Sequence, residues 1–252
     1  MRQRRVSGIE EKLAEYSDLI LKPKTLDDIP HQFDNGSLPT ASQGDSVHVP
    51  HDRYVRWYQR LSEQFGIPSG YERIYAEFGC GRGQFITTIA KNDPDGLYIG
   101  VEGCKTIVYK AIKKAKATEL NNVYFIDQFI NEASTAFSEN ALAGIFLNFS
   151  DPWPKDRHAD RRLTAPAKAL SYRKILKPDG FVAFKTDKED FFDYSYKVFE
   201  EAGYVIESTT RNLEATSSVC GIDVAANGAA TQTEYEQKFR ALELPIYYFL
   251  AR

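Results

Sequence analysis

From residue 53 onward, short apolar β-type runs alternate with stretches of helical periodicity, and this alternation constrains the fold more than any other feature of the chain. The runs are rich in Ile, Val, Leu, Tyr and Phe, and they lie at residues 74–78, 97–101, 123–126, 143–147, 181–185, 204–208 and 245–251. Helical stretches between them include residues 105–118, a helix that begins at an N-cap near Thr164, and residues 189–202, with a Lys-Pro-Asp-Gly turn at residues 177–180. Because strands that alternate with helices form parallel sheets with right-handed crossovers, we predict an α/β fold.

Residues 1–52 have a different character. They are polar, carry few apolar clusters able to bury a core, and are interrupted by prolines and glycines at Pro23, Pro30, Gly36, Pro39 and Gly44. The whole chain of 252 residues, 42% of them hydrophobic, suits one large core better than two. We therefore predict an N-terminal arm over residues 1–52, flexible in part, followed by one domain over residues 53–252.

Charge and cysteine content exclude several classes of protein. The formal net charge is −3 and the sequence pI is about 5.9, so any binding to nucleic acid must come from local basic patches. The three cysteines form no CxxC pair and the four histidines show no metal spacing, which argues against a disulfide framework and a metal site. The start of the chain lacks the apolar stretch of a signal peptide, and no run approaches the roughly 18 apolar residues of a membrane span. We expect a cytoplasmic protein that binds neither a membrane nor a metal.

A glycine-rich sequence, EFGCGRG at residues 77–83, follows the first β-type run and precedes a helical stretch. Glycines at such a turn let a ligand approach the backbone, and Glu102 follows the next strand at the place where an acidic side chain reaches ribose hydroxyls. Together they indicate a nucleoside-containing cofactor. The dinucleotide pattern requires a third glycine where the chain has Gln84, and the carboxylate of Glu77 would repel a pyrophosphate. This favours S-adenosylmethionine, whose methionine end is positively charged, while the alternative is a tight strand-to-helix turn with solvated acids.

The sequence NFSDPWPKDRHADRR at residues 148–162 is the most informative in the chain. The apolar run before it predicts a buried strand, so Asp151 should emerge where that strand ends, which is where open α/β sheets place their ligands. A carboxylate fixed by rigid prolines can accept hydrogen bonds from guanine N1–H and the exocyclic amine, Trp153 can stack on the ring, and the basic cluster can hold phosphates. These residues indicate a site that recognises a nucleic-acid base. Taken singly, Asp151 can also end a strand in an Asx turn, Trp153 can lie in the core, and the basic cluster can be a solvated surface.

Two further positions extend this site. Asp187 ends another predicted strand on the same edge of the sheet, although it can equally be the N-cap of the next helix. The sequence TEYE at residues 233–236 precedes Lys238 and Arg240, and its alternative role is to start a short helix. We expect both to lie over the pocket that contains Asp151.

Residues 148–164 closely resemble the signature of bacterial tRNA (guanine-N7-)-methyltransferases, NFPDPWPKxRHxxRRLT. The sequences EFGCGRG, IGVE, KTD and TEYE also resemble motifs of that family and occur in the same order, so the resemblance covers roughly residues 53–252. It implies a class I, Rossmann-like methyltransferase fold, with a seven-stranded, mostly parallel sheet whose last strand is antiparallel and with helices on both faces. It also implies methyl transfer from S-adenosylmethionine to N7 of a guanine in the tRNA variable loop (position 46 in the family). Whether the enzyme is a monomer or a homodimer stays open.

The resemblance and the motifs together assign roles to individual residues. Asp151 stands at the position that the family is proposed to use in catalysis. The residues expected to bind the cofactor are Glu77, Gly79, Gly81, Gly83, Glu102, Asp127 and Asp151. Those expected to bind the tRNA substrate are Lys155, Asp187, Thr233, Glu234, Tyr235 and Glu236, and those expected to lie against the RNA are Arg157, His158, Arg161 and Arg162.

Two positions depart from the family pattern. Ser150 replaces the proline before Asp151, which relaxes the backbone but keeps the acid. The family acid that contacts the adenine end of the cofactor falls on Phe129 by ungapped counting, and Asp127 or Asn131 is the nearest substitute. A dinucleotide-dependent oxidoreductase and a non-catalytic RNA-binding protein of the same fold are the alternative classes.

Overall fold

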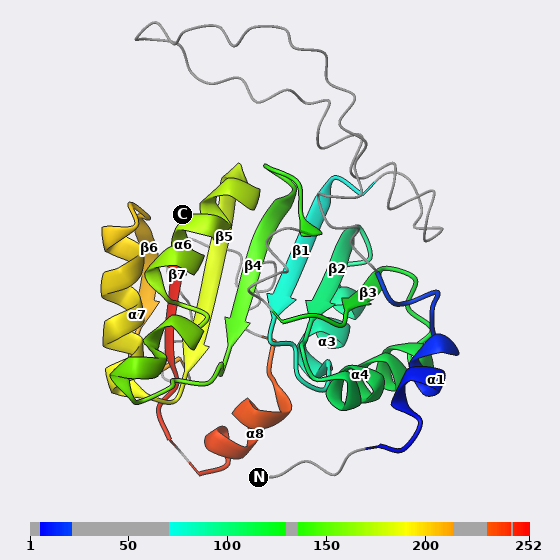
Figure 1. Ribbon diagram of the computed structural model, residues 1–252. Coiled ribbons are helices and arrows are strands. Elements are labelled where there is room, and N and C mark those ends of the chain that lie inside the picture. The colour runs from blue at the N-terminus through cyan, green and yellow to red at the C-terminus, as the bar shows by residue number, and fades with distance from the viewer. Residues whose placement is uncertain (1–5, 22–70, 130–135, 214–230, 243) are drawn as a thin grey trace, which may run out of the picture.

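The structure, a computed structural model, describes residues 6–21, 71–129, 136–213, 231–242 and 244–252 (Figure 1). The domain boundary predicted between residues 52 and 53 lies outside these ranges. In chain order the elements are α1 (Ile9–Ala14), β1 (Arg73–Phe78), α3 (Gln84–Asn92), β2 (Gly96–Val101), α4 (Lys105–Ala117), β3 (Val123–Ile126), β4 (Leu142–Asn148), the 3-10 helix η2 (Asp156–Arg161), α6 (Pro166–Ile175), β5 (Leu176–Thr186), α7 (Glu189–Glu201), β6 (Ile206–Thr210), α8 (Glu234–Arg240) and β7 (Tyr247–Ala251).

The described strands form one seven-stranded sheet in the order β3-β2-β1-β4-β5-β7-β6. β7 runs antiparallel to β5 and β6, and the other neighbouring strands are parallel, so the predicted sheet is confirmed. The first three strands run from β1 at the middle of the sheet to β3 at one edge. The chain then returns to the middle, where β4 pairs with β1, and the remaining strands extend to the opposite edge. Right-handed crossovers therefore put α3 and α4, which pack on the β2–β3 half, on the opposite face from α6 and α7, which pack on the β5–β7 half (Figure 1). The order reverses between β1 and β4, where sheets of this kind bind ligands.

The central strands are buried because helices cover both faces of the sheet. Every residue of β2 and β3 is buried, and in β1 only Arg73 is partly exposed. Such strands appear in the sequence as continuous apolar runs, as expected for parallel strands covered on both sides. The rings of Tyr75, Phe146 and Phe181 lie 5.7 to 6.1 Å apart in this core. The carboxyl ends of these strands therefore rest on a closely packed support.

Two local predictions around α6 are wrong. Residues 177–180 belong to β5, which bulges in its ladder with β4, and do not form a separate turn. The N-cap of α6 is Ala165 and not Thr164. Thr164 is fully buried instead, and its Oγ1 accepts a hydrogen bond from Ser195 Oγ at 2.8 Å, which ties the start of α6 to α7.

The described part of the N-terminal arm packs against the sheet. Its buried side chains are Leu13, Leu19, Ile20 and Leu21. Ile20 forms a parallel bridge with Phe125 of β3, and the backbone N–H of Leu21 donates to the Phe125 carbonyl at 2.7 Å. The α1 helix packs on α4 at the same edge of the sheet (Figure 1). The prediction that the arm buries few apolar side chains is therefore wrong for residues 6–21.

Ile20→Ala tests this packing. We expect the free energy of unfolding to fall by about 2 to 5 kcal/mol, because a fully buried side chain is truncated beside β3. Urea unfolding at equilibrium measures the change, and Glu15→Ala, on an exposed side chain of the same segment, is the control. A loss below about 0.5 kcal/mol, the usual range of surface substitutions, would show that the segment detaches without effect on the core.

Candidate functional site

The glycine-rich sequence forms the turn between β1 and α3, as predicted. Gly79, Gly81 and Gly83 all have positive φ angles, of 75°, 55° and 73°, which favour glycine. A Cβ on Gly83 would lie 2.9 Å from Ala111 Cβ, so this glycine also permits close packing of α3 on α4. A Cβ on Gly81 would meet no heavy atom within 4 Å. The backbone at Gly81 is therefore open to a ligand.

Glu102 joins this turn to the loop after β2. Its Oε2 accepts the backbone N–H of Gly81 at 3.3 Å, and its Oε1 accepts that of Cys104 at 2.9 Å. Burial raises the pKa of Glu102, the two N–H groups oppose the rise, and the nearby charge of Asp151 adds to it. A carboxylate has about four acceptor positions, so Glu102 keeps the capacity to accept hydrogen bonds from hydroxyl groups.

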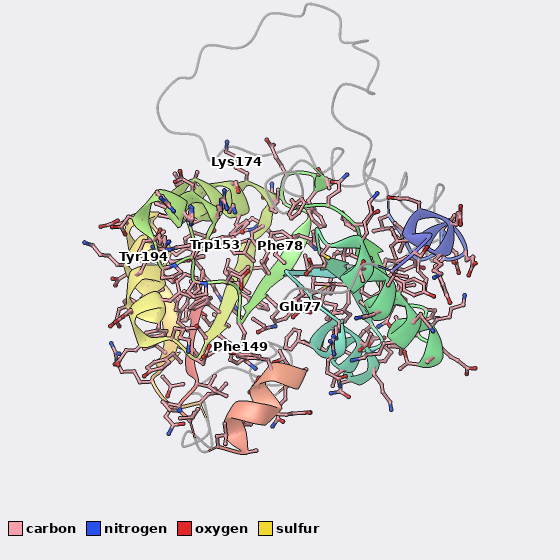
Figure 2. The ribbon with its side chains drawn as sticks, turned by 60° about the horizontal axis from the view of Figure 1, so that its bottom comes forward. Glu77, Phe78, Phe149, Trp153, Lys174 and Tyr194 are labelled. Carbon is pink, nitrogen blue, oxygen red and sulfur yellow. The ribbon has the colours of Figure 1, made fainter. Side chains whose placement is uncertain are left out.

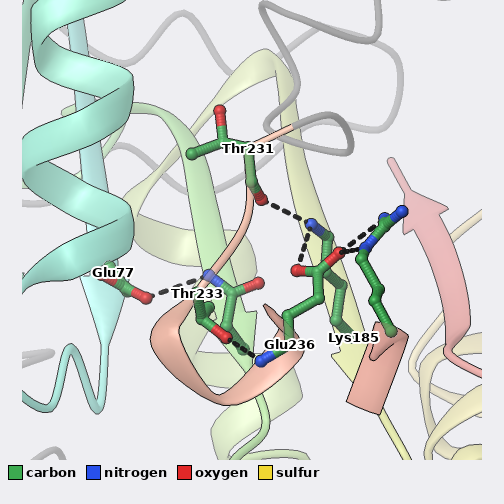
Figure 3. Close-up of polar contacts among 7 residues, drawn as sticks. Glu77, Lys185, Thr231, Thr233 and Glu236 are labelled. Carbon is green, nitrogen blue, oxygen red and sulfur yellow. Dashed lines mark hydrogen bonds and ion pairs between the residues drawn. The ribbon is translucent and has the colours of Figure 1, made fainter. Parts of the chain in front are cut away.

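Glu77 lies at the end of β1, beside the point where the strand order reverses. Its side chain is buried, and its Oε1 accepts a hydrogen bond from Asn148 Nδ2 of β4 at 3.0 Å (Figure 3). Its Oε2 has no hydrogen-bond partner of good geometry among the described residues, although the Ile86 N–H of α3 lies near enough to favour the ionised form. Burial raises the pKa of Glu77 to about 8, against the effects of Asn148, Ile86 and Lys185. A cation placed beside this buried carboxyl would favour its ionised form.

Asp151 and Asp187 follow the neighbouring parallel strands β4 and β5, at the carboxyl-terminal end of both strands. Asn148 of β4 pairs in register with Lys185 of β5, and each acid follows within a few residues. Asp151 is exposed, and its charge acts on Glu102 across the reversal point. The Asp187 side chain is 7% exposed, and its Oδ2 lies 2.8 Å from Lys188 Nζ. The N-cap of α7 is Lys188, so the alternative role of Asp187 as a helix cap is wrong.

The sequence TEYE does start a helix, α8, which lies below the carboxyl ends of β1, β4 and β5 in Figure 1. Thr233 Oγ1 accepts the backbone N–H of Glu236 at 2.8 Å. The Glu236 side chain is fully buried: Oε2 lies 3.2 Å from Lys185 Nζ, and Oε1 accepts two hydrogen bonds from Arg240, at 2.8 and 3.1 Å (Figure 3). Lys185 Nζ also donates to the Thr231 carbonyl at 2.8 Å. Glu236 is therefore bound by two cations, whereas the sequence predicted contact with the substrate.

Tyr235 faces outward. It is 45% exposed, and its ring lies 5.2 Å from the Phe149 ring, which follows β4. The nearby charges of Asp187 and Lys188 both act on its hydroxyl. The side chain of Glu234, which was also predicted to bind the substrate, lies outside the described part of the structure. Sequence reasoning missed Lys185, although a lysine within an otherwise apolar run was a signal for a buried partner.

The basic cluster divides into two groups. Lys155 and Arg157 are exposed. Arg161 is exposed as well, although its guanidinium lies over the Trp153 ring, whereas the partly buried His158 and Arg162 turn toward the loop that contains Trp153. The structure therefore brings only part of the predicted RNA-contacting set to the surface.

The loop after β3 contains the position where the sequence departs from the family. Asp127 is partly buried, and its charge contributes to the raised pKa of Lys105, for which Glu10 is the main cause. Phe129 is 71% exposed, and its ring lies on Gly103, where a Cβ would be 2.4 Å from a ring carbon. Asn131 lies outside the described residues. An exposed aromatic ring thus stands beside Glu102.

Over the described ranges, no three His, Cys, Asp or Glu side chains gather in a way that would hold a metal ion. No helix in those ranges combines the length and the apolar character needed to cross a membrane.

Known proteins match most of this chain. A family model described as a putative methyltransferase matches residues 71–249. The tRNA (guanine-N(7)-)-methyltransferase of Lachnoclostridium phytofermentans is 36% identical over 217 residues, which cover 86% of this chain and 94% of that protein. Proteins of the same name from Bacillus licheniformis and Bacillus subtilis are 40% and 37% identical over 174 residues, 69% of this chain and 78% of each.

Solved structures share the fold. The 16S rRNA methyltransferase KamB gives a TM-score of 0.53 at 12% identity, over 75% of this chain and 91% of that chain. An antibiotic-related methyltransferase gives a TM-score of 0.52 at 17% identity, over 77% and 92%. At these identities the matches show the class I methyltransferase fold alone.

Glu77→Gln tests the environment of the buried carboxyl. Because the pKa in the folded state, about 8, lies above the ordinary value of 4.5, the folded protein binds the proton more tightly than the unfolded chain does. The contribution of Glu77 to the free energy of unfolding is thus fully present below about pH 4.5 and is lost as pH rises toward about 8. Relative to wild type, the neutral variant should gain up to ~1.4 kcal/mol per pH unit across that window.

Urea unfolding at about pH 5 and about pH 8.5 measures the difference. Glu72→Gln, on an exposed glutamate before β1, controls for the change in net charge. If the difference in the free energy of unfolding between Glu77→Gln and wild type is the same at both pH values, the carboxyl is hydrated in the folded protein.

Proposed function

The chain belongs to the tRNA (guanine-N(7)-)-methyltransferase family, and from this membership we propose that it methylates N7 of a guanine in the variable loop of tRNA (position 46 in the family), using S-adenosylmethionine. The observation that carries the proposal is the convergence of Glu77, Glu102 and Asp151 on the glycine turn where the strand order reverses. The oxidoreductase and the non-catalytic RNA-binding protein are not favoured.

The residues at the reversal point fit the cofactor. The open backbone at Gly81 gives a ligand room, and the cationic methionine end near Glu77 would favour the ionised form of this buried carboxyl. Glu102 would accept hydrogen bonds from the ribose hydroxyls. Bound S-adenosylmethionine would supply the methyl group. Phe129 would pack on the adenine ring, replacing the hydrogen bond of the family acid with stacking, and Asp127 would lie beside it.

The protein's part in the reaction is mainly alignment. Guanine N7 carries a lone pair and no proton, so attack through N7 needs no general base. Asp151 and Asp187 would accept hydrogen bonds from the N1–H and the exocyclic amine, and so orient N7. The base has to be exposed from the folded RNA, at a cost of a few kcal/mol. Tyr235 and Thr233 would border the base pocket, and exposed Lys155 and Arg157 would contact phosphates.

The direct test is nucleoside analysis of tRNA incubated with the protein and S-adenosylmethionine. Mass spectrometry should detect 7-methylguanosine in digests of the treated tRNA. Methylation at another atom or base would contradict the proposal, and so would the absence of any methylated nucleoside.

Asp151→Ala tests the orienting acid. Because Asp151 is exposed at a strand end, the free energy of unfolding should change by less than about 0.5 kcal/mol. Loss of a charged hydrogen-bond acceptor should lower kcat by about 10- to 100-fold. Asp95→Ala is the matched control, because Asp95 is an exposed aspartate that precedes β2, at the amino-terminal end of the parallel strands and away from the site. A kcat near wild type would remove Asp151 from the reaction.

Phe129→Ala tests the adenine contact. Titration calorimetry with S-adenosylhomocysteine should show affinity about 5- to 100-fold weaker, as expected when a base loses an aromatic platform. Phe129→Tyr keeps the ring and should bind as wild type does. Unchanged affinity of Phe129→Ala would place the adenine elsewhere.

A further inference from the structure

The loop around Asp151 contains unusual backbone conformations. Phe149 and Trp153, on either side of the acid, have positive φ angles of 49° and 40°. Residues other than glycine rarely adopt such angles, and they do so where surrounding contacts hold them. The position of Asp151 therefore depends on whatever holds residues 149–153.

Phe149 is held by β5, because its N–H donates to the Lys185 carbonyl at 2.8 Å, and Arg162 holds the other end of this loop. Its Nε donates to the Pro152 carbonyl at 2.9 Å, and its Nη2 donates to the Trp153 carbonyl at 3.1 Å. Its guanidinium carbon lies 4.2 Å from the centre of the Tyr194 ring on α7. Figure 2 labels Trp153 and Tyr194, which this side chain connects. Arg162 thus ties the loop to a helix that packs on β5 and β7.

Neighbouring residues cover the Trp153 ring. The Arg161 guanidinium carbon lies 5.0 Å from its centre, and the His158 ring meets it edge-on at 5.7 Å. Arg161 is nevertheless exposed, as are Lys155 and Arg157, whereas His158 and Arg162 are partly buried. His158 and Arg162 are therefore engaged within the protein, whereas Lys155, Arg157 and Arg161 stay at the surface, where RNA can reach them.

We propose that Arg162 is a positioning residue for methyl transfer, which fixes the backbone at Pro152 and Trp153 and thereby orients Asp151, and that it does not bind a tRNA phosphate. The proposal rests on the function proposed above. A planar guanidinium satisfies two carbonyls and stacks on a ring at the same time. An ammonium group keeps the charge that a phosphate needs, but it cannot make this combination of contacts.

Arg162→Lys separates the two roles. If Arg162 positions the loop, kcat at saturating tRNA and cofactor should fall by about 10- to 100-fold, as small misplacements near reacting atoms do. The dependence of tRNA affinity on salt and the affinity for S-adenosylhomocysteine should stay as in wild type. The salt slope is the steepness with which the logarithm of the tRNA binding constant falls with the logarithm of salt concentration. In Arg157→Ala it should decrease by about 0.7 to 0.9, which corresponds to the loss of one phosphate contact.

Arg173→Lys is the matched control. Arg173 makes the same kind of contact away from the site, with its guanidinium 4.7 Å from the Tyr204 ring centre and a hydrogen bond to the Ala202 carbonyl at 3.3 Å. Its variant should methylate tRNA at the wild-type rate. Should Arg162→Lys prove too unstable to assay, Tyr194→Leu removes the stacking surface and should lower kcat in the same way, whereas Tyr194→Phe keeps the ring and should not.

A measurement without turnover distinguishes failure of this inference from failure of the proposed function. In a Trp57→Phe background Trp153 is the only tryptophan. Arg162→Lys should then increase the quenching of Trp153 fluorescence by acrylamide, whatever reaction the protein catalyses. Wild-type kcat and quenching in Arg162→Lys, or a reduced salt slope in Arg162→Ala with kcat unchanged, would overturn the proposal.

Discussion

The hydrogen bond between Asn148 and Glu77 lies at the centre of this structure, because it joins the two strands between which the order of the sheet reverses. On one side of this point the glycine turn and Glu102 form the region assigned to the cofactor, and on the other Asp151 and Asp187 form the region assigned to the base. A buried carboxyl is stable there only if its proton or a cation compensates its charge. The same group therefore links the stability of the sheet end to the charge of what binds beside it.

The buried pair of Lys185 and Glu236 places α8 over this region. With side chains 1% and 0% exposed, the pair has lost nearly all hydration, so its attraction must offset a large desolvation cost. Removing either partner would leave an uncompensated buried charge and cost about 3 to 5 kcal/mol. Glu236 therefore affects the site indirectly, by holding the start of α8 in place and with it the exposed Tyr235.

The sequence predicted the sheet, the glycine turn and the edge where the acids meet, because strand alternation and turn glycines are local signals. It did not predict the packing of Ile20 on β3, although the apolar residues 19–21 were a weak signal, since contact with a distant strand leaves no local pattern. It also assigned Glu236 to the substrate, because a polar segment appears exposed until its partner in β5 is known. For the same reason a run of basic residues does not reveal which guanidinium turns inward.

This division of the basic residues limits how the protein attracts tRNA. Lys185 and Arg240 neutralise Glu236, and Arg162 is engaged with the loop beside Asp151. With a formal net charge of −3, the molecule offers phosphates a smaller positive surface than the motif suggests. Under the function proposed above, long-range attraction would be weak, and selection of the guanine would rely on how the base fits between Asp151, Asp187 and the aromatic side chains. A site of this kind tolerates small changes in surface charge better than small displacements of its loops.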